Sequence, residues 1–257
     1  MLLFWNKIHR FAGGIFEIVG GSTILLLNAF CQIRFNARDL GRLVQQFQLI
    51  GINSFPLAVM IGFFTGMIFA LNFGIPLRDY GAEETIGGIL TVAMVRTLGP
   101  VFTAFILAAR VGSAMTAELG TMSVSEEIDS LRMMNIKPER FLALPRILGS
   151  IIINPLLTIY STSAGVVGGW LVARSYLNVS DDTYWLDIYR LMNSKEVYTG
   201  LTKSVVFALV YSSICVYIGM TTKGGAEGVG RSTTTAVVSS LTMILVADFV
   251  ITRFIFG

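Results

Sequence analysis

Six long apolar stretches run through this chain, and they limit the folds that it can adopt. They cover residues 11–31, 52–77, 86–109, 147–173, 200–221 and 233–256. A helix of about 20 mainly apolar residues is long enough to cross the hydrocarbon core of a bilayer. Charged residues make up 14% of the chain, against about 25% in typical soluble domains. The sequence therefore predicts an all-α polytopic membrane protein that forms a single domain over residues 1–257.

The first apolar stretch differs from the other five. It contains Glu17 and four glycines, and the amphipathic segment LLFWNKIHRF precedes it. Its aromatic residues suit the headgroup level of a membrane, where its basic residues would face lipid phosphates. Three arrangements fit this pattern: a cleaved signal peptide, a full span, and an elbow that dips into the membrane and returns to the same side. A signal peptide is the weakest of them, because no small-x-small cleavage site closes the run.

Basic residues help to choose among these arrangements, because cytoplasmic loops of membrane proteins carry an excess of lysine and arginine. With an elbow and a cytoplasmic N-terminus, the loops around 32–51, 110–146 and 222–232 face the cytoplasm and hold most of the basic residues. A full first span from an inside N-terminus would reverse this distribution. The pattern therefore favours an interfacial or elbow helix over residues 1–31, followed by five transmembrane helices. A full first span with an outside N-terminus also keeps a basic majority inside.

The segment AELGTMSVSEEID, residues 117–129, concentrates acidic residues in the longest of these cytoplasmic loops. Ser123 followed by Glu126 fits a capping box, in which a hydroxyl and a carboxylate bind the free N–H groups at a helix start. The carboxylates of the segment are Glu118, Glu126, Glu127 and Asp129. Two interpretations remain open: an ordinary solvated loop helix, or a docking helix for a cytoplasmic partner.

An apolar stripe accompanies these carboxylates. Val124, Ile128 and Leu131 recur at the spacing of one helix face. Pro138 lacks an N–H group, so we expect the helix to end after Lys137. The sequence thus predicts a short amphipathic helix that lies on the cytoplasmic ends of the spans.

Three charged residues fall inside the predicted spans, where charges are costly unless they are paired or hydrated. Arg96 lies near the middle of its span, and Lys203 and Asp248 lie in the outer halves of the last two. A Lys203–Asp248 pair is geometrically possible, with Arg96 as a competitor for Asp248. One interpretation is a structural ion pair. The other is a water-filled cavity that receives an anionic lipid headgroup, for whose phosphate the planar donor fork of Arg96 is suited.

The sequence offers little that could perform chemistry. Its single histidine, His9, and its two cysteines, Cys31 and Cys215, form no metal-binding or catalytic pattern. The segment GAEGVGRS, residues 225–232, nearly matches a phosphate-binding loop, but Arg231 replaces the required lysine. We interpret this segment as a flexible cytoplasmic turn before the last span. The chain is therefore not predicted to be an enzyme, and no cofactor is expected in it.

Several separated motifs resemble one known family. The run RTLGPVFTAFILAARVGSAMTAELGTMSVSEEIDSLRMM, residues 96–134, is similar to the signature of MlaE-type permeases. The resemblance continues through TKSVVFALV at 202–210, GVGRSTTTAVV at 228–238 and ADFVITRFIFG at 247–257. These motifs match in order and span most of the chain. The resemblance implies a permease subunit of an ABC transporter that works with MCE-domain proteins.

The resemblance also implies partners and a substrate class. Such permeases form homodimers in the bacterial inner membrane, with cytoplasmic ATPase subunits that bind ATP and magnesium. An MCE-domain protein lies on the periplasmic side, and glycerophospholipid moves between the inner membrane and the outer envelope. Residues 117–137 then form a coupling loop that inserts into a groove on the ATPase. The residues expected to make this contact are Glu118, Ser123, Glu126, Glu127 and Asp129.

One departure from the family pattern affects the expected substrate site. Many members carry glutamate after the arginine of this motif, whereas this chain has Thr97 after Arg96. Arg96 without that neighbour is expected to pair with Asp248 or to be freer for phosphate. The lipid-binding residues implied by the resemblance are Phe69, Phe73, Leu77, Tyr80, Arg96 and Thr97.

Two other function classes remain as alternatives. The chain could be an ion-coupled secondary transporter that uses the intramembrane charges as a relay. It could also be a membrane scaffold without transport. The three classes predict different energy requirements: ATP hydrolysis by a separate subunit, an ion gradient, or none.

Overall fold

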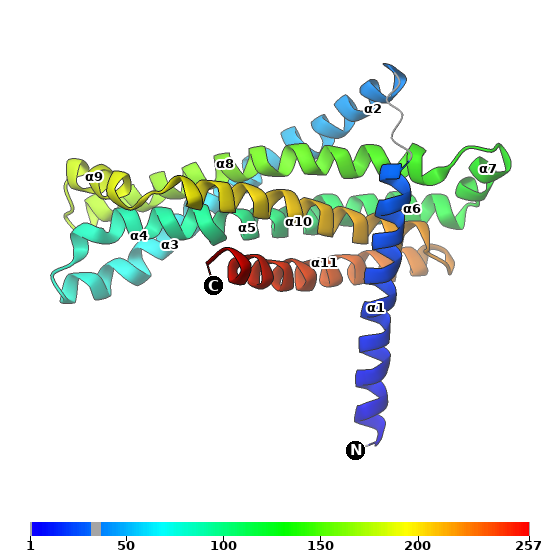
Figure 1. The fold of residues 1–257 in the computed structure, drawn as a ribbon, viewed down its shortest axis with the longest axis horizontal. Coiled ribbons are helices and arrows are strands. Elements are labelled where there is room, and N and C mark those ends of the chain that lie inside the picture. Colours follow the sequence, from blue (N-terminus) through cyan, green and yellow to red (C-terminus); the bar gives the residue numbers. More distant parts are fainter. Residues whose placement is uncertain (1, 32–36, 257) are drawn as a thin grey trace. The chain divides into compact units, whose positions relative to one another are not determined.

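The computed structural model describes residues 2–31 and 37–256, and within these ranges all regular structure is helical. Short π-helical turns, named η1 and η3 to η5, and one 3₁₀ turn, η2, lie between or continue the α-helices (Figure 1). The elements are α1 (Leu2–Cys31), α2 (Ala37–Phe47), η1 (Gln48–Ile52), α3 (Asn53–Asp79), η2 (Glu83–Thr85), α4 (Ile86–Ala93), η3 (Met94–Leu98), α5 (Gly99–Leu107), η4 (Ala108–Gly112), α6 (Ser113–Val124), α7 (Glu127–Met133), η5 (Glu139–Ala143), α8 (Leu144–Ser175), α9 (Asp181–Leu191), α10 (Ser194–Met220) and α11 (Gly225–Phe256).

Five continuous helical segments are long and apolar enough to cross a membrane. They are Leu43–Asp79, Glu83–Val124, Glu139–Ser175, Ser194–Met220 and Gly225–Phe256. Four of them contain a whole predicted span, and Ser194–Met220 contains all of the span 200–221 except its last residue. Each extends beyond the predicted span at one or both ends, because backbone hydrogen bonding continues into polar residues that hydropathy excludes. The predicted all-α fold with five transmembrane helices is confirmed. The segment 225–232, expected to be a flexible turn, instead forms the first turns of α11.

The first apolar stretch belongs to one unbroken helix, α1. Glu17–Cys31 forms a shorter apolar helix within it. A turn back toward the same side would interrupt the helix, and Leu2–Cys31 contains no such interruption. The structure therefore has a single N-terminal helix here rather than a hairpin inside the segment.

The chain divides into two compact units. Unit 1 comprises Met1–Gln48, Leu107–Ser150 and Ala208–Ile244, and therefore holds the three loops predicted to be cytoplasmic. A small core of Ile214, Cys215, Ile218 and Ala236 lies within it, and Ile18 of α1 packs against this core. Thr116 of α6 donates to the carbonyl oxygen of Cys215 at 3.0 Å, which ties α6 to α10.

Unit 2 comprises Leu49–Ile106, Ile151–Phe207 and Leu245–Gly257. Its core is formed by large side chains of α4, η3, α8 and α9, among them Leu90, Met94 and Tyr184. Gly62 and Gly66 of α3 face the backbone of α8, and a Cβ atom at either position would overlap a carbonyl oxygen there. These two glycines therefore allow α3 and α8 to approach each other closely.

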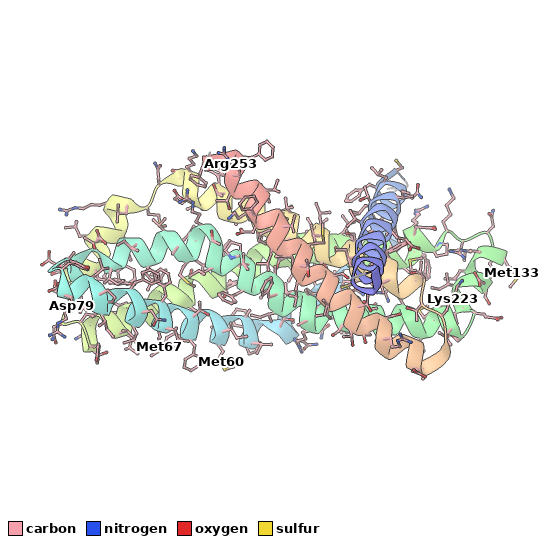
Figure 2. The ribbon with its side chains drawn as sticks, turned by 90° about the horizontal axis from the view of Figure 1, so that it is seen from below. Met60, Met67, Asp79, Met133, Lys223 and Arg253 are labelled. Carbon is pink, nitrogen blue, oxygen red and sulfur yellow. The ribbon has the colours of Figure 1, made fainter. Side chains whose placement is uncertain are left out.

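The outward side of unit 2 is strongly apolar. On α3, Met60, Phe64 and Ile68 are each more than half exposed, and Figure 2 shows Met60 projecting outward. Phe249 and Phe254 of α11 are 72% and 86% exposed. Side chains of this kind suit contact with lipid acyl chains. Apolar surface that stays in water forgoes about 25 cal/mol of burial free energy per Å².

Candidate functional site

A buried ion pair lies between two spans of unit 2. Lys203 of α10 is completely buried, and its Nζ lies 2.6 Å from Oδ1 of Asp248 on α11. The same Nζ donates to the hydroxyl oxygen of Thr97 in η3 at 3.3 Å. The structure therefore joins the predicted pair and adds Thr97 as a neutral third partner of Lys203.

Local backbone geometry brings these elements together. The π-helical turn η3 precedes α5, whose second residue, Pro100, has no N–H to donate. Single π-helical turns of this kind occur frequently at functional sites. On α10, Gly200 lies one turn before Lys203, and a Cβ atom there would overlap the carbonyl of Val95. A glycine at this position thus allows Lys203 to approach η3 closely.

Arg96 has partners other than Asp248. Its Nε lies 3.4 Å from Oε2 of Glu196 on α10. Its guanidinium carbon lies 3.2 Å from the centre of the Phe256 ring on α11, which is a cation–π arrangement. Arg96 was expected to pair with Asp248 or to stand free. In the structure it contacts Glu196 instead.

Sequence reasoning missed Glu196 and Phe256. Glu196 precedes Lys203 by seven residues, which is about two helical turns and places both on one face of α10. That spacing could have identified Glu196 as a second intramembrane partner. Phe256 carried no such signal, because its contact with Arg96 depends on where α11 ends.

The predicted acyl-chain residues of α3 fall into two groups. Phe69 and Phe73 stack with ring centres 4.2 Å apart. Phe69 and Leu77 also pack against the core of unit 2, whereas Phe73 and Tyr80 are 50% and 84% exposed. The exposed members are available to a lipid and the packed members support them. The described partners of Arg96 lie on α10 and α11. Its membership of the same lipid site as these residues stays a prediction.

The acidic segment in unit 1 is attached to the rest of the unit at two points. Glu118 lies 2.8 Å from Nη2 of Arg146 at the start of α8. Arg146 is buried and also donates to the carbonyl oxygen of Leu142 at 2.8 Å. Ser123 donates to the carbonyl oxygen of Thr222 at 3.0 Å, just after the end of α10.

The predicted capping box is wrong. Ser123 lies inside α6, and α7 begins only at Glu127, with no side-chain cap on its first N–H groups. Carbonyl groups at the end of α10 lack partners within their own helix, and Ser123 binds Met220 as well as Thr222 there. Glu126 instead adopts a left-handed conformation, φ 60°, in the turn between α6 and α7.

The predicted end of this helix is also wrong. α7 stops at Met133, and Asn135 follows in a left-handed conformation, φ 58°. Asparagine tolerates this conformation and commonly ends helices. The chain therefore leaves the helix before Pro138 can interrupt it.

The carboxylates of the turn remain exposed, as the amphipathic pattern predicted. Ile128 is buried and holds α7 in place, although Val124 is 38% exposed and does not complete the stripe. Glu127 accepts a hydrogen bond from Ser125 at 3.1 Å, and Asp129 pairs with Arg132 at 2.9 Å. Glu126, Glu127 and Asp129 are all exposed on the surface of unit 1.

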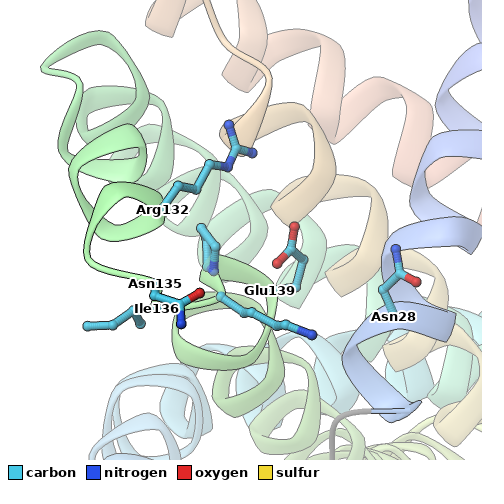
Figure 3. A pocket seen from close by; sticks show the side chains of 7 residues that line it. Asn28, Arg132, Asn135, Ile136 and Glu139 are labelled. Atoms are coloured by element: carbon cyan, nitrogen blue, oxygen red, sulfur yellow. The ribbon is translucent and has the colours of Figure 1, made fainter.

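A hollow of about 330 Å³ lies beside this segment (Figure 3). It is lined by Asn28, Arg132, Asn135, Ile136, Lys137, Pro138 and Glu139. Two cations and one carboxylate give it a mixed charge. It belongs to unit 1, whereas every predicted lipid-binding residue belongs to unit 2. The hollow is therefore part of the surroundings of α7 and not of the predicted substrate site.

The chain has five helices that are long and apolar enough to cross a membrane, and a charge pair joins two of them. These features, with the acidic turn formed by Glu126, Glu127 and Asp129, define the class of multi-pass membrane proteins. Among the described residues, no group of three or more histidine, cysteine or acidic side chains could hold a metal ion. The family model described as Permease MlaE matches residues 43–254. The chain therefore belongs to the MlaE permease family and is a multi-pass inner membrane protein, which confirms the resemblance seen in its motifs.

Individual relatives cover most of the chain. A probable ABC transporter permease protein of Synechocystis is 36% identical over 88% of this chain and 84% of its own length. The intermembrane phospholipid transport system permease protein MlaE of Haemophilus influenzae is 32% identical, covering 94% of this chain and 93% of its own length. The chloroplastic protein TRIGALACTOSYLDIACYLGLYCEROL 1 of Arabidopsis thaliana is 37% identical over 83% of this chain and 61% of its own length.

Proposed function

We propose that this chain is the membrane-spanning subunit of an ATP-driven ABC transporter that moves glycerophospholipids between the inner membrane and the outer envelope. Membership of the MlaE family supports this function, as does the name of the Haemophilus influenzae relative, an intermembrane phospholipid transport system permease protein. The chain would work as a homodimer, with a cytoplasmic ATPase and a periplasmic MCE-domain protein.

The exposed acidic turn is the observation that carries the proposed ATPase contact. Glu126, Glu127 and Asp129 face solvent, while Ile128 is buried beneath them. Complementary charges give an interface its register and orientation more than its affinity. Basic residues on the ATPase would meet these carboxylates. Ser123 and the Glu118–Arg146 pair would pass movement of the turn to α10 and α8.

The ATPase itself would be a separate subunit. In a phosphate-binding loop, backbone N–H groups are free to surround phosphates. Residues 225–232 instead form the first turns of α11, with no free loop at these positions, and Arg231 stands in place of the lysine. We therefore expect no ATP hydrolysis by this polypeptide alone, with ATP and magnesium bound by its partner.

The proposed lipid site is in unit 2. Arg96 is 30% exposed, so its remaining guanidinium N–H groups could meet a headgroup phosphate while Nε stays beside Glu196. The exposed rings of Phe73 and Tyr80 would contact acyl chains. Thr97 would act through Lys203 and not directly on lipid, since its hydroxyl accepts from that buried ammonium.

Reconstitution tests the function as a whole. Vesicles containing the chain, its ATPase and its MCE-domain partner are given labelled glycerophospholipid, with or without ATP. We expect net lipid movement only when ATP and the ATPase are both present. Movement driven by an ion gradient would identify a secondary transporter. A stable complex that moves no lipid under either condition would identify a scaffold.

Charge reversal tests the ATPase contact. Glu126→Lys combined with Glu127→Lys should remove most of the ATPase from the purified complex, because like charges would then face each other across the interface. The matched control is Glu84→Lys with Asp182→Lys, which makes the same charge change on exposed residues of unit 2. Co-purification measures the effect. Equal ATPase retention in both variants would place the contact elsewhere.

A further inference from the structure

The short helix α9 lies between the outer ends of two spans and has one face locked to unit 2. Figure 1 shows α9 beside α4, and the two elements are in contact. Tyr184 and Ile188 are buried, and the N–H of Gly88 donates to Oδ2 of Asp187 at 2.6 Å. The Tyr184 hydroxyl donates to the carbonyl oxygen of Val166 at 2.9 Å. Burial raises the pKa of Tyr184, so this hydroxyl stays protonated as a donor.

The exposed surface of α9 carries three large side chains beside two charged ones, Asp182 and Arg190. Trp185, Leu186 and Tyr189 are 46%, 53% and 89% exposed. With about 3.6 residues per turn, Leu186 and Tyr189 lie away from Tyr184 and Ile188. Trp185 lies at the edge of the buried face, and its ring centre is 5.6 Å from that of Tyr184. Full exposure of a large apolar side chain to water forgoes roughly 1.5–3 kcal/mol of burial free energy. A second environment is therefore needed to cover this face.

Contacts fix the level of α9 along the spans. Gly87 and Gly88, near the start of α4, lie directly against α9, and side chains there would collide with Tyr184 and Leu191. The links from α8 and to α10 are short, residues 176–180 and 192–193. The helix is thus held where the apolar run of α4 begins, which is the boundary of the hydrocarbon region.

Other exposed aromatic side chains occupy the same end of the spans. Tyr80 follows α3, Tyr176 follows α8, and Tyr198 lies in the first turns of α10; they are 84%, 56% and 72% exposed. These three tyrosines belong to elements other than α9, so they are not part of its exposed face. Below them, Val167 and Leu171 of α8 are exposed and apolar. This arrangement matches an aromatic belt above an acyl-facing surface, where tyrosine and tryptophan are enriched.

We propose that α9 is an interfacial helix whose face formed by Trp185, Leu186 and Tyr189 lies in the headgroup region of the outer leaflet. Tryptophan and tyrosine suit this region because their rings are apolar and their tips donate hydrogen bonds. The membrane surface is favoured over a protein partner because the exposed aromatic residues are spread over several elements and continue into the acyl-facing surface of α8. This inference rests on the chain spanning a membrane with the predicted orientation and is independent of the transport function.

Fluorescence quenching tests this placement. The chain has three tryptophans, so Trp5→Phe with Trp170→Phe leaves Trp185 as the single probe. The complete chain is placed in nanodiscs whose lipids carry bromine atoms either near the headgroup or near the acyl terminus. We expect the shallow bromines to quench Trp185 about twofold more strongly than the deep ones, as an interfacial position requires. The matched control keeps Trp170, which packs against the core of unit 2 and should be quenched less.

Three results would overturn the proposal. Stronger quenching by deep bromines would place α9 in the acyl core. Absence of quenching by either lipid would leave this face in water. Absence of quenching combined with a blue shift on addition of the MCE-domain protein would assign the face to that partner. If the double variant Trp5→Phe with Trp170→Phe fails to fold, Trp185→Phe in the otherwise unchanged chain is the second variant, and the quenching by shallow bromines that it loses is the contribution of Trp185.

Discussion

The Lys203–Asp248 pair of unit 2 and the ion pairs near the acidic segment of unit 1 differ in how far water reaches them. In unit 2, Lys203 is fully buried and Asp248 is 18% exposed. In unit 1, Arg146 is 8% exposed but its partner Glu118 is 61% exposed, and the Arg132–Asp129 pair is exposed on both sides at 57% and 62%. The same kind of charge pair therefore has three different environments in one chain.

This difference in exposure separates charges that must stay paired with each other from charges that can bind another subunit. A buried charge must keep its partner, because desolvation without compensation is costly. An exposed carboxylate retains its hydration and can exchange it for a cation on another subunit at small net cost. The difference explains why the acidic turn of unit 1 suits a docking role, whereas Asp248 suits an internal one.

Asp248→Asn tests the most buried of these ion pairs and should have the largest effect on stability. The substitution leaves the Lys203 ammonium buried without a carboxylate, which typically costs about 3–5 kcal/mol when a buried pair is broken. Thermal unfolding in detergent measures the loss of stability. The double variant Lys203→Met with Asp248→Leu should recover most of it, because an apolar pair of similar size removes both charges.

The same variant also distinguishes the two interpretations of the pair. A stable, assembled Asp248→Asn complex that moves no lipid would assign the pair to transport. Lower expression with normal lipid movement per assembled complex would assign it to structure. No stability loss in the single variant would show that water reaches Lys203 and would break the comparison between the units.

Glu118→Gln tests the intermediate case. Arg146 keeps its hydrogen bond to the Leu142 carbonyl, and Glu118 is largely solvated, so we expect a loss of about 1 kcal/mol. Because the pair joins α6 to α8, ATPase activity should also respond less to lipid. Glu227→Gln, at another exposed glutamate of unit 1, is the matched control and should change neither property. A loss as large as that of Asp248→Asn would contradict this difference between the pairs.

Asp129→Asn tests the most exposed of the three ion pairs and should have the smallest effect on folding stability. Surface pairs in helices contribute about 0.3–0.5 kcal/mol, and salt screens them. Unfolding of the isolated chain should therefore be nearly unchanged, while ATPase binding weakens if Asp129 lies in that interface. A folding loss above roughly 1 kcal/mol would mean that the turn is structural.

Much of the fold followed from the sequence because hydropathy and helix length are local properties. The five spans were predicted with errors only at their ends, and the burial of Ile128 was predicted from spacing alone. The segment 225–232 was misjudged because its glycines indicated a turn, whereas it continues the α11 helix. Helix propensity is a weak guide where tertiary packing stabilises the helix.

The sequence by itself predicted which charges lie inside the membrane and that they need partners. Only the tertiary structure decided the partners: Glu196 and Phe256 for Arg96, Asp248 and Thr97 for Lys203, and Arg146 for Glu118. The same is true of Ser123, which resembles a local cap but binds the end of α10. The physical reason is distance along the chain. A cap, a span or a stripe is specified by neighbours in sequence, whereas an ion pair between helices depends on how the helices pack.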